Sequence, residues 1–218
     1  MQLNRRTFVA SVGALAGTTI AGCSQLASDE PLEFEATPAQ VPDDVLAETG
    51  YQENEVNAIE IERSFDVAGD ERTVTVTNQQ AEYEKQIDAD IQLPSDLSGP
   101  VYTTLSTPKI EILGQELNPV ADMSNEELLE RLQNRYDRLE NVEVDTEDTM
   151  TVLGEPTTRT RFLAETRLDG NDVELYLHVS NPVENGEEFV ASAGVHPRFL
   201  PDEESEVLAM MEAIQHGD

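Results

Sequence analysis

Tryptophan is absent from this chain of 218 residues, and cysteine occurs once, as Cys23. A single cysteine excludes an intrachain disulfide, so the fold cannot depend on a cross-link. Aromatic residues make up only 5% of the chain, and any core must be built from Val, Leu, Ile and a few Phe and Tyr. Lysine is scarce as well, because Lys85 and Lys109 are the only two.

Acidic residues dominate the charge: 45 Asp and Glu stand against 13 Lys and Arg, a formal net charge of −32. A chain of this kind can be disordered, but disordered acidic chains carry their charge in blocks. Here the acids are interleaved with apolar residues at regular spacing. We favour adaptation to concentrated salt, where a Debye length of about 3 Å screens the self-repulsion of a folded chain. The sequence has no basic stripe that could neutralise phosphates, which argues against nucleic-acid binding.

The N-terminus has the layout of an export signal. Arg5 and Arg6 precede an apolar stretch, residues 8–20. This stretch is shorter than the about 20 apolar residues that span a bilayer, so it indicates a signal peptide over residues 1–22 rather than a membrane helix. The arginine pair, with Phe8 two positions after Arg6, resembles the twin-arginine export signal, and we expect Arg5 and Arg6 to direct export.

The segment from Thr19 to Cys23 resembles a lipobox, in which small residues lead into an obligatory cysteine. In that class the thiol takes a diacylglyceryl group, and cleavage makes the cysteine the first residue of the mature chain. The resemblance implies membrane lipid as a partner through Cys23, and two acyl chains anchor a protein stably. An ordinary buried cysteine is the alternative. Residues 23–40 predict a flexible tether, and residues 41–218 a single globular domain.

The first half of the domain predicts one helix and several strands. Residues 45–47, with acids before them and Gly50 after them, predict a short helix. Alternating residues in 58–65 and 72–83, around a Gly69-Asp70 turn, predict a β-hairpin. We further predict a loop over 88–100, followed by segments 101–105 and 109–113 as a strand pair or one interrupted strand.

The middle of the domain predicts a longer helix. Ser124 and Glu127 match a capping box, with Met123 and Leu128 at the positions of a hydrophobic staple. Apolar residues continue at helical spacing, so we predict a helix over residues 124–139.

The final third predicts a meander followed by a helix. The predicted strands are residues 150–153, 157–168, 173–180 and 188–196. A register with Val179 opposite Phe189 places the apolar residues of the last two strands on one face. The last helix begins at residues 201–204 and carries an apolar side of Val207, Leu208, Met211 and Ile214. Together these elements predict an α+β fold, in which an antiparallel sheet is packed with helices. A parallel sheet is not expected, because strands and helices do not alternate along the chain.

Over most of its length the chain resembles a family of haloarchaeal lipoproteins of unknown function. The resemblance is carried by the arginine pair with Ala21-Gly22-Cys23, and by residues 46–51, 106–114, 118–119, 176–179 and the last helix. It brings no known activity with it. From Ser124 onward the order of elements is also similar to PsbP-like domains, whose α/β/α sandwich implies binding or assembly rather than catalysis.

Candidate catalytic groups are few. Nucleophilic catalysis requires a nucleophile, a base and a group that orients the base. Cys23 is assigned to lipid, and the sequence has no Gly-x-Ser-x-Gly elbow. The predicted register places His178 and His196 near opposite ends of their hairpin, with His196 opposite Asp172. His216 lies in a terminus that we expect to fray. We therefore predict no catalytic, cofactor-binding or metal-binding residue.

Two further segments have competing interpretations. A run of acids could hold a hard cation weakly, although a solvated surface in a salt-adapted protein explains it better: Glu143, Asp145, Glu147 and Asp148. The turn at 169–172 does not match a twelve-residue calcium loop. Residues 106–109 either line a cleft or form a connection that needs fixed backbone angles, and we favour the connection.

Two functions remain open. The one we favour is a non-enzymatic module, anchored on the outer face of the cell membrane, that binds or stabilises an envelope protein. It predicts an exposed apolar patch or groove. The alternative is an envelope hydrolase or metal-dependent enzyme that uses carboxylates, and it predicts acids of raised pKa gathered in one deep pocket.

Overall fold

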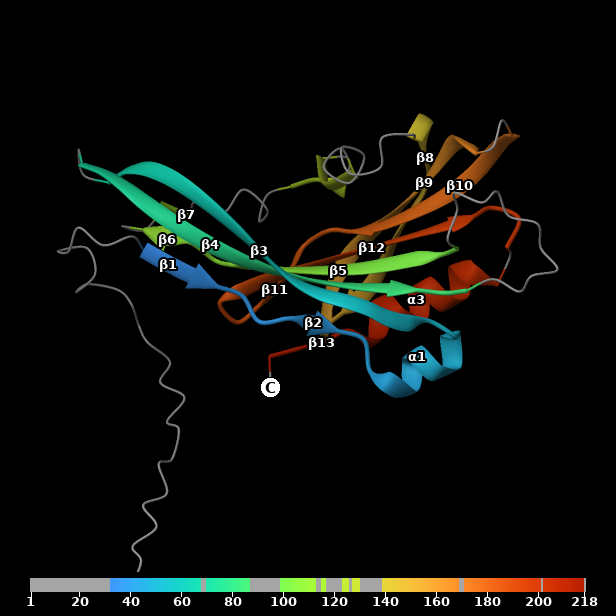
Figure 1. The fold of residues 1–218 in the computed structure, drawn as a ribbon, viewed down its shortest axis with the longest axis horizontal. Helices are drawn as coiled ribbons and strands as arrows, with labels where there is room; N and C mark the ends of the chain where they lie inside the picture. Colours follow the sequence, from blue (N-terminus) through green and yellow to red (C-terminus); the bar gives the residue numbers. More distant parts are fainter. Residues whose placement is uncertain are drawn as a thin grey trace, which may run out of the picture. The chain divides into compact units, whose positions relative to one another are not determined.

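The computed structural model describes residues 32–67, 70–86, 99–112, 115–116, 123–125, 127–129, 139–168, 171–200 and 202–217. The fold is mostly β, with one nine-stranded mixed sheet in the order β1-β4-β5-β12-β10-β9-β8, in which β3 pairs with β4 and β11 with β12 (Figure 1). β2 and β13 form a second small sheet, and β6 and β7 a third.

The labelled helices are α1 (Asp43–Thr49) and α3 (Glu203–Ala213). The strands are β1 (Leu32–Glu35), β2 (Ala39–Gln40), β3 (Gln52–Val67), β4 (Asp70–Glu84), β5 (Val101–Pro108), β6 (Glu111–Ile112), β7 (Gln115–Glu116), β8 (Leu139–Val152), β9 (Glu155–Leu168), β10 (Asn171–Ser180), β11 (Val183–Asn185), β12 (Glu188–Pro197) and β13 (Gln215–His216).

The first predicted helix and the hairpin are confirmed. Helix α1 ends at Gly50, which has a φ of 78° and donates its N–H to the Leu46 carbonyl over 2.9 Å. That left-handed conformation suits glycine, because it has no Cβ. The hairpin is longer than predicted, since β3 pairs with β4 over almost its whole length.

Two expectations about the N-terminal part are wrong. Residues 32–35 and 39–40, assigned to the tether, instead form β1 and β2. Strand β1 pairs with β4 in parallel, with Leu32 opposite Val74, so the sheet is mixed and not purely antiparallel. A four-residue strand at the end of the tether carries too few residues for a clear alternating pattern.

The predicted register of the last hairpin is wrong by four residues. Val179 lies opposite Ala193, and Leu177 lies opposite Val195. The cause is β11, which pairs with the start of β12 and takes Phe189 opposite Glu184. A shift of four residues keeps the same side chains on the same face, so the hydrophobic pattern could not reveal the error.

The strand ahead of this meander is also longer than predicted, because β8 begins at Leu139 rather than at Met150. Its pairing with β9 is interrupted by two irregularities, between Glu140 and Glu143 and between Val144 and Thr146. Bulges of this kind break the period-two alternation from which a strand is recognised.

The predicted helix at 124–139 is confirmed at its start. The Ser124 N–H donates to Glu127 Oε2 over 2.9 Å, and the Glu127 N–H donates to Ser124 Oγ over 3.3 Å, the two bonds of a capping box. Residues 130–138 lie outside the described part, as do 88–98 of the predicted loop. Leu139 belongs to β8 and not to a helix.

Apolar side chains cover both faces of the sheet. One core holds residues of α1 and α3 with sheet residues such as Tyr83 and Tyr102. The other core holds Leu128 and Leu129 with Leu175, Leu177 and Val179 of β10 and their neighbours. In Figure 1, α1 and α3 lie on the same side of the sheet. Alternation along β10 therefore turns Tyr176, His178 and Ser180 toward α3.

Candidate functional site

A buried polar network lies on the face of the sheet that α3 covers. We define it as Arg159 on β9, His178 on β10, His196 on β12, Asp148 on β8 and Glu204 on α3. The first three side chains are almost fully buried, with 3%, 0% and 1% of their surface exposed. The observed register brings the histidines together, because His196 lies opposite Tyr176, two residues from His178.

The two imidazole rings form a hydrogen-bonded chain. His178 Nε2 lies 2.9 Å from His196 Nε2, and the rings stack with centroids 5.0 Å apart. Arg159 Nη1 donates to His178 Nδ1 over 2.9 Å, and His196 Nδ1 lies 3.1 Å from the Pro197 carbonyl.

These contacts fix the tautomer of each ring. The guanidinium can only donate and the carbonyl can only accept. His178 therefore carries its proton on Nε2 and donates it to His196, which carries its own proton on Nδ1. Both rings are neutral, and an added proton would leave two N–H groups facing each other.

Arg159 anchors this chain to two other elements. Its Nε donates to Asp148 Oδ1 over 3.1 Å, and its Nη2 contacts the second oxygen of the same carboxylate. Its Nη1 also donates to Glu204 Oε1 over 3.1 Å. Glu204 binds the neighbouring Arg161 as well, so one carboxylate of α3 joins two arginines of β9.

Burial governs the protonation of both histidines. Loss of solvation lowers the pKa of His178 well below its usual 6.5, and the charges of His196, Arg159 and Arg161 lower it further. Burial also lowers the pKa of His196, against the opposing effects of the Pro197 carbonyl and Glu204. The pair is thus held neutral at neutral pH.

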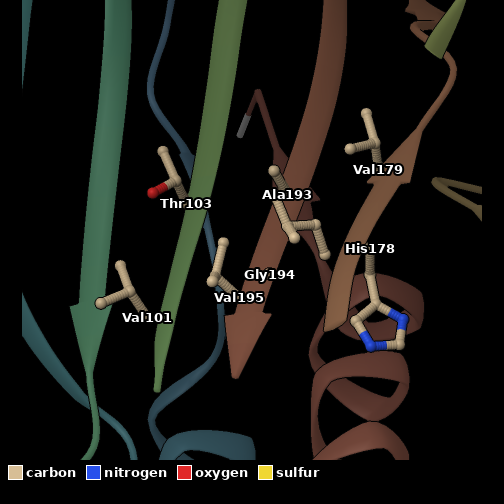
Figure 2. Close-up of a pocket in the computed structure, with 8 residues that line it drawn as sticks. Val101, Thr103, His178, Val179, Ala193, Gly194 and Val195 are labelled. Atoms are coloured by element: carbon tan, nitrogen blue, oxygen red, sulfur yellow. The ribbon is translucent and has the colours of Figure 1, made fainter. Parts of the chain in front are cut away.

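A small hollow lies between β5, β12 and β10 on the face of the sheet away from α3. Its volume is about 10 Å³, room for a single water molecule at most, and its lining includes Leu177 and Val179, which belong to the core on that face. Figure 2 shows Val101 and Thr103 of β5 beside Ala193 and Val195 of β12, with Val179 and His178 on β10. Apolar side chains dominate this lining. The network itself is enclosed, with three of its side chains almost fully buried, so its geometry fits a structural tie between α3 and the sheet better than a substrate pocket.

The sequence interpretation of the histidines is corrected by these contacts. His178 and His196 are bonded neighbours instead of lying at opposite ends of a hairpin. His216 does not fray, because β13 pairs with β2. Its Nε2 lies 2.8 Å from Glu188 Oε2, and its Nδ1 lies 3.1 Å from Asn185 Oδ1.

Glu188 joins three distant parts of the chain at this second site. Besides His216, its carboxylate accepts the Thr37 N–H over 2.8 Å. Burial alone would raise the pKa of Glu188, but the hydrogen bonds from His216 and Thr37 outweigh it, so the pKa is lowered. The carboxylate therefore stays charged.

The two lysines also have defined places. Lys85 Nζ lies 2.7 Å from Glu203 Oε1 and contacts Glu206, while the Tyr51 hydroxyl donates to Glu203 Oε2 over 3.1 Å. Lys109 pairs with Glu184. Residues 106–108, expected as a connection, belong to β5 instead, with Ser106 and Thr107 buried.

The predicted site residues Arg5, Arg6 and Cys23 lie outside the described residues. Two of the acids of β8 form ion pairs with arginines: Asp145 binds Arg161, and Asp148 binds Arg159. The part of the chain that the structure describes holds no group of three or more potential ligands that could bind a metal ion. It also contains no helix long and apolar enough to cross a membrane.

Sequence reasoning missed Arg159 and Glu204, although a signal for Arg159 was present. Its strand alternates, and the period of two places residue 159 on the face opposite Phe162. An arginine on a covered face requires acceptors. Glu204 gave no such signal, because acids are common at helix starts.

A mostly β domain with a mixed sheet and few helices is thus the class that the fold defines. Residues 38–215 match the family described as domain of unknown function DUF6517, and the chain belongs to that family. No curated protein matches it.

Two solved structures share a distant likeness. Cyanobacterial PsbP (CyanoP) from Synechocystis sp. PCC 6803 is 10% identical, with a TM-score of 0.42, and the match covers 84% of this chain and 93% of that one. Protein PA94 from Pseudomonas aeruginosa, a putative regulator of unknown function by its description, is 12% identical, with a TM-score of 0.30, covering 72% and 99%.

Proposed function

We propose that the protein is a lipid-anchored binding or assembly module on the outer face of the cell membrane of a salt-adapted organism. The observation that carries the proposal is the position of the single cysteine, Cys23. It ends a segment that resembles a lipobox and follows an arginine-led apolar stretch. The acidic composition supports the salt adaptation. The binding role is supported by the exposed side chain of Phe199 and the depression beside it.

The described ionisable groups favour binding over catalysis. Burial raises the pKa of Glu206, and Lys85 forms an ion pair with this carboxylate. Glu206 lines neither the hollow at Leu177 nor the depression at Phe199. A carboxylate-based hydrolase would require several such acids around one pocket, and we therefore keep it only as the alternative.

One exposed apolar side chain supports the binding role. Phe199 is 52% exposed and lies with Val173 beside a shallow depression whose charged rim is Asp172, Glu174 and Arg198. An exposed aromatic ring with a polar rim is the usual anatomy of a protein contact. We expect Phe199→Asp to abolish capture of an envelope partner from membranes in molar salt, and Val144→Asp, at another exposed apolar residue, to preserve it.

The anchor is tested by fractionation of cells. Cys23→Ser should move the protein from the membrane fraction to the medium, because the serine hydroxyl does not take the lipid. Ser24→Ala is the matched control and should stay with the membrane. If Cys23→Ser remains in the membrane fraction as wild type does, the proposed anchor is refuted.

For the fold, we propose that the full domain is a PsbP-like α/β/α sandwich. Leu128 and Leu129 pack on one face of the sheet, and α3 packs on the other. Hydrogen exchange at amides 128 and 129 should then be as slow as within α3. Exchange at the rate of exposed loops would contradict helices on both faces.

A further inference from the structure

The chain between Cys23 and the sheet is short. Eight residues separate Cys23 from Leu32, the first residue of β1. A segment of this length reaches at most about 30 Å when fully extended. A lipid on Cys23 would therefore hold Leu32 within about 30 Å of the membrane surface.

Leu32 lies near one end of the sheet. It pairs with Val74, four residues after Asp70, where β4 leaves the hairpin turn. At about 3.3 Å per residue, Leu32 is about 13 Å from that turn and about 33 Å from Glu84, at the other end of β4. Figure 1 shows β1 beside the hairpin end of β3 and β4, with α1 near their opposite end.

Phe199 lies at that opposite end. Glu84 pairs with Val101 of β5, and Val101 pairs with Val195 of β12. Phe199 follows β12 by two residues. The depression proposed for partner binding thus lies toward the end of the sheet opposite to the hairpin end.

The long sides of the sheet are poorly suited to lie on a membrane. Strands β3 and β8, each paired with one strand only, run along these sides, and both expose carboxylates along their length: Glu53, Glu55, Glu60, Glu62, Glu140, Glu143 and Glu147. Contact along either edge would remove water from a whole row of these charges, whereas contact at one end of the sheet involves only a few of the charges on each strand.

We propose that the end of the domain formed by the β3–β4 hairpin and the start of β1 faces the lipid surface, while the Phe199 end points away from it. The inference rests on the lipid anchor at Cys23 proposed above. The partner at the hairpin end is the headgroup layer of the membrane. A protein partner would meet the domain at its exposed outer end.

The composition of the chain makes this orientation measurable. The full chain contains one cysteine, which can be coupled to a maleimide-bearing phospholipid in vesicles. It contains no tryptophan, so one introduced indole is the only one. Ser64→Trp places it on the hairpin at an exposed position, and Phe199→Trp places it at the other end. Energy transfer from each indole to dansyl-labelled headgroups is then compared in molar KCl.

We expect transfer from position 64 to exceed transfer from position 199 at least threefold. Equal transfer, or more from position 199, would overturn the proposal. Thr73→Trp, exposed and opposite Ser64, replaces Ser64→Trp if that variant does not fold. Inserting 20 Gly and Ser residues after Ser24 should remove most of the difference, because a long flexible tether no longer restricts Leu32.

The coupling in vitro separates this inference from the proposed function. If the protein carries no lipid in cells but the coupled chain shows the threefold difference, only the proposed anchor fails. If the protein carries the lipid in cells and the two positions transfer equally, only the orientation fails.

Discussion

Every ring nitrogen of His178 and His196 has a partner, and this requirement governs how the pair responds to protons. The chain from Arg159 through both rings to the Pro197 carbonyl needs two neutral imidazoles. A third proton has no free site, because both unprotonated nitrogens, His178 Nδ1 and His196 Nε2, already accept hydrogen bonds. Protonation must therefore break the chain or open the fold.

Acidification should consequently destabilise the domain. The folded pKa of both histidines is lowered from about 6.5, so the unfolded chain binds more protons below that value. Their contribution is fully present above pH 6.5 and is lost as pH falls toward the folded pKa. Each histidine adds a slope of at most about 1.4 kcal/mol per pH unit. Urea unfolding in molar KCl at pH 7.5, 6.5 and 5.5 measures this loss.

The acidic surface also titrates at low pH, so a matched variant is needed. His178→Gln with His196→Gln removes the two titrating rings and keeps the carboxylates unchanged. The stability of this variant should fall less than that of wild type between pH 7.5 and 5.5. Parallel pH profiles would contradict the assignment of a lowered pKa to the pair.

Arg159 should be the most sensitive position of the network. Arg159→Met leaves His178, Asp148 and Glu204 without their shared donor, and we expect a loss of about 3 kcal/mol in unfolding free energy. Arg167→Met is the control, because its ion pair with Asp172 is exposed and its loss should change stability little. A similar loss of unfolding free energy in both variants would contradict a stabilising role of the buried network.

At the scale of elements, α3 is seated on the sheet through a close approach at Gly194. A Cβ on Gly194 would lie 2.6 Å from Val207 Cγ1, closer than atoms can pack. Val207 is fully buried in the core beneath α3. Glycine at this strand position therefore sets the depth at which the helix lies.

Gly194→Ala should push α3 outward and cost about 1–3 kcal/mol of unfolding free energy. Val207→Ala alone should also destabilise, through the cavity that it leaves. The double variant should lose less than the sum, because the new methyl group occupies part of the vacated space. Strict additivity in thermal or urea unfolding would show that the two positions do not touch.

The elements were predictable where local signals are strong. The Gly50 cap, the Ser124–Glu127 capping box and the long hairpin each depend on residues close in sequence. The parallel pairing of β1 with β4 joins segments far apart in the sequence, which periodicity does not encode. Strand β11 pairs with the neighbouring β12, but its three residues are too few to show an alternating pattern. The histidine pair was missed because the register shift that β11 causes keeps the hydrophobic pattern.

For the whole molecule, charge sets the conditions under which the fold is stable. At a formal charge of −32 the described acids outnumber their basic partners, and exposed carboxylates line both sheet edges. Their mutual repulsion is weak at a Debye length of about 3 Å and strong at about 30 Å. High salt should therefore be part of the stability of the domain.

Dialysis from 2 M KCl into 10 mM KCl should unfold or loosen the domain. Far-ultraviolet circular dichroism should show loss of the β spectrum, and restoring the salt should recover it. Substituting the four exposed glutamates of β3, Glu53, Glu55, Glu60 and Glu62, by glutamine should lower the salt concentration at the midpoint. An unchanged spectrum in 10 mM KCl would refute salt adaptation.

The intact mass of the protein extracted from its native membrane tests the central claim most directly. The proposed anchor predicts a chain that begins at Cys23 and carries the added mass of a lipid with two hydrocarbon chains, released by detergent and not by salt. A full-length chain recovered from the cytosol, still bearing residues 1–22 and an unmodified Cys23, would contradict it.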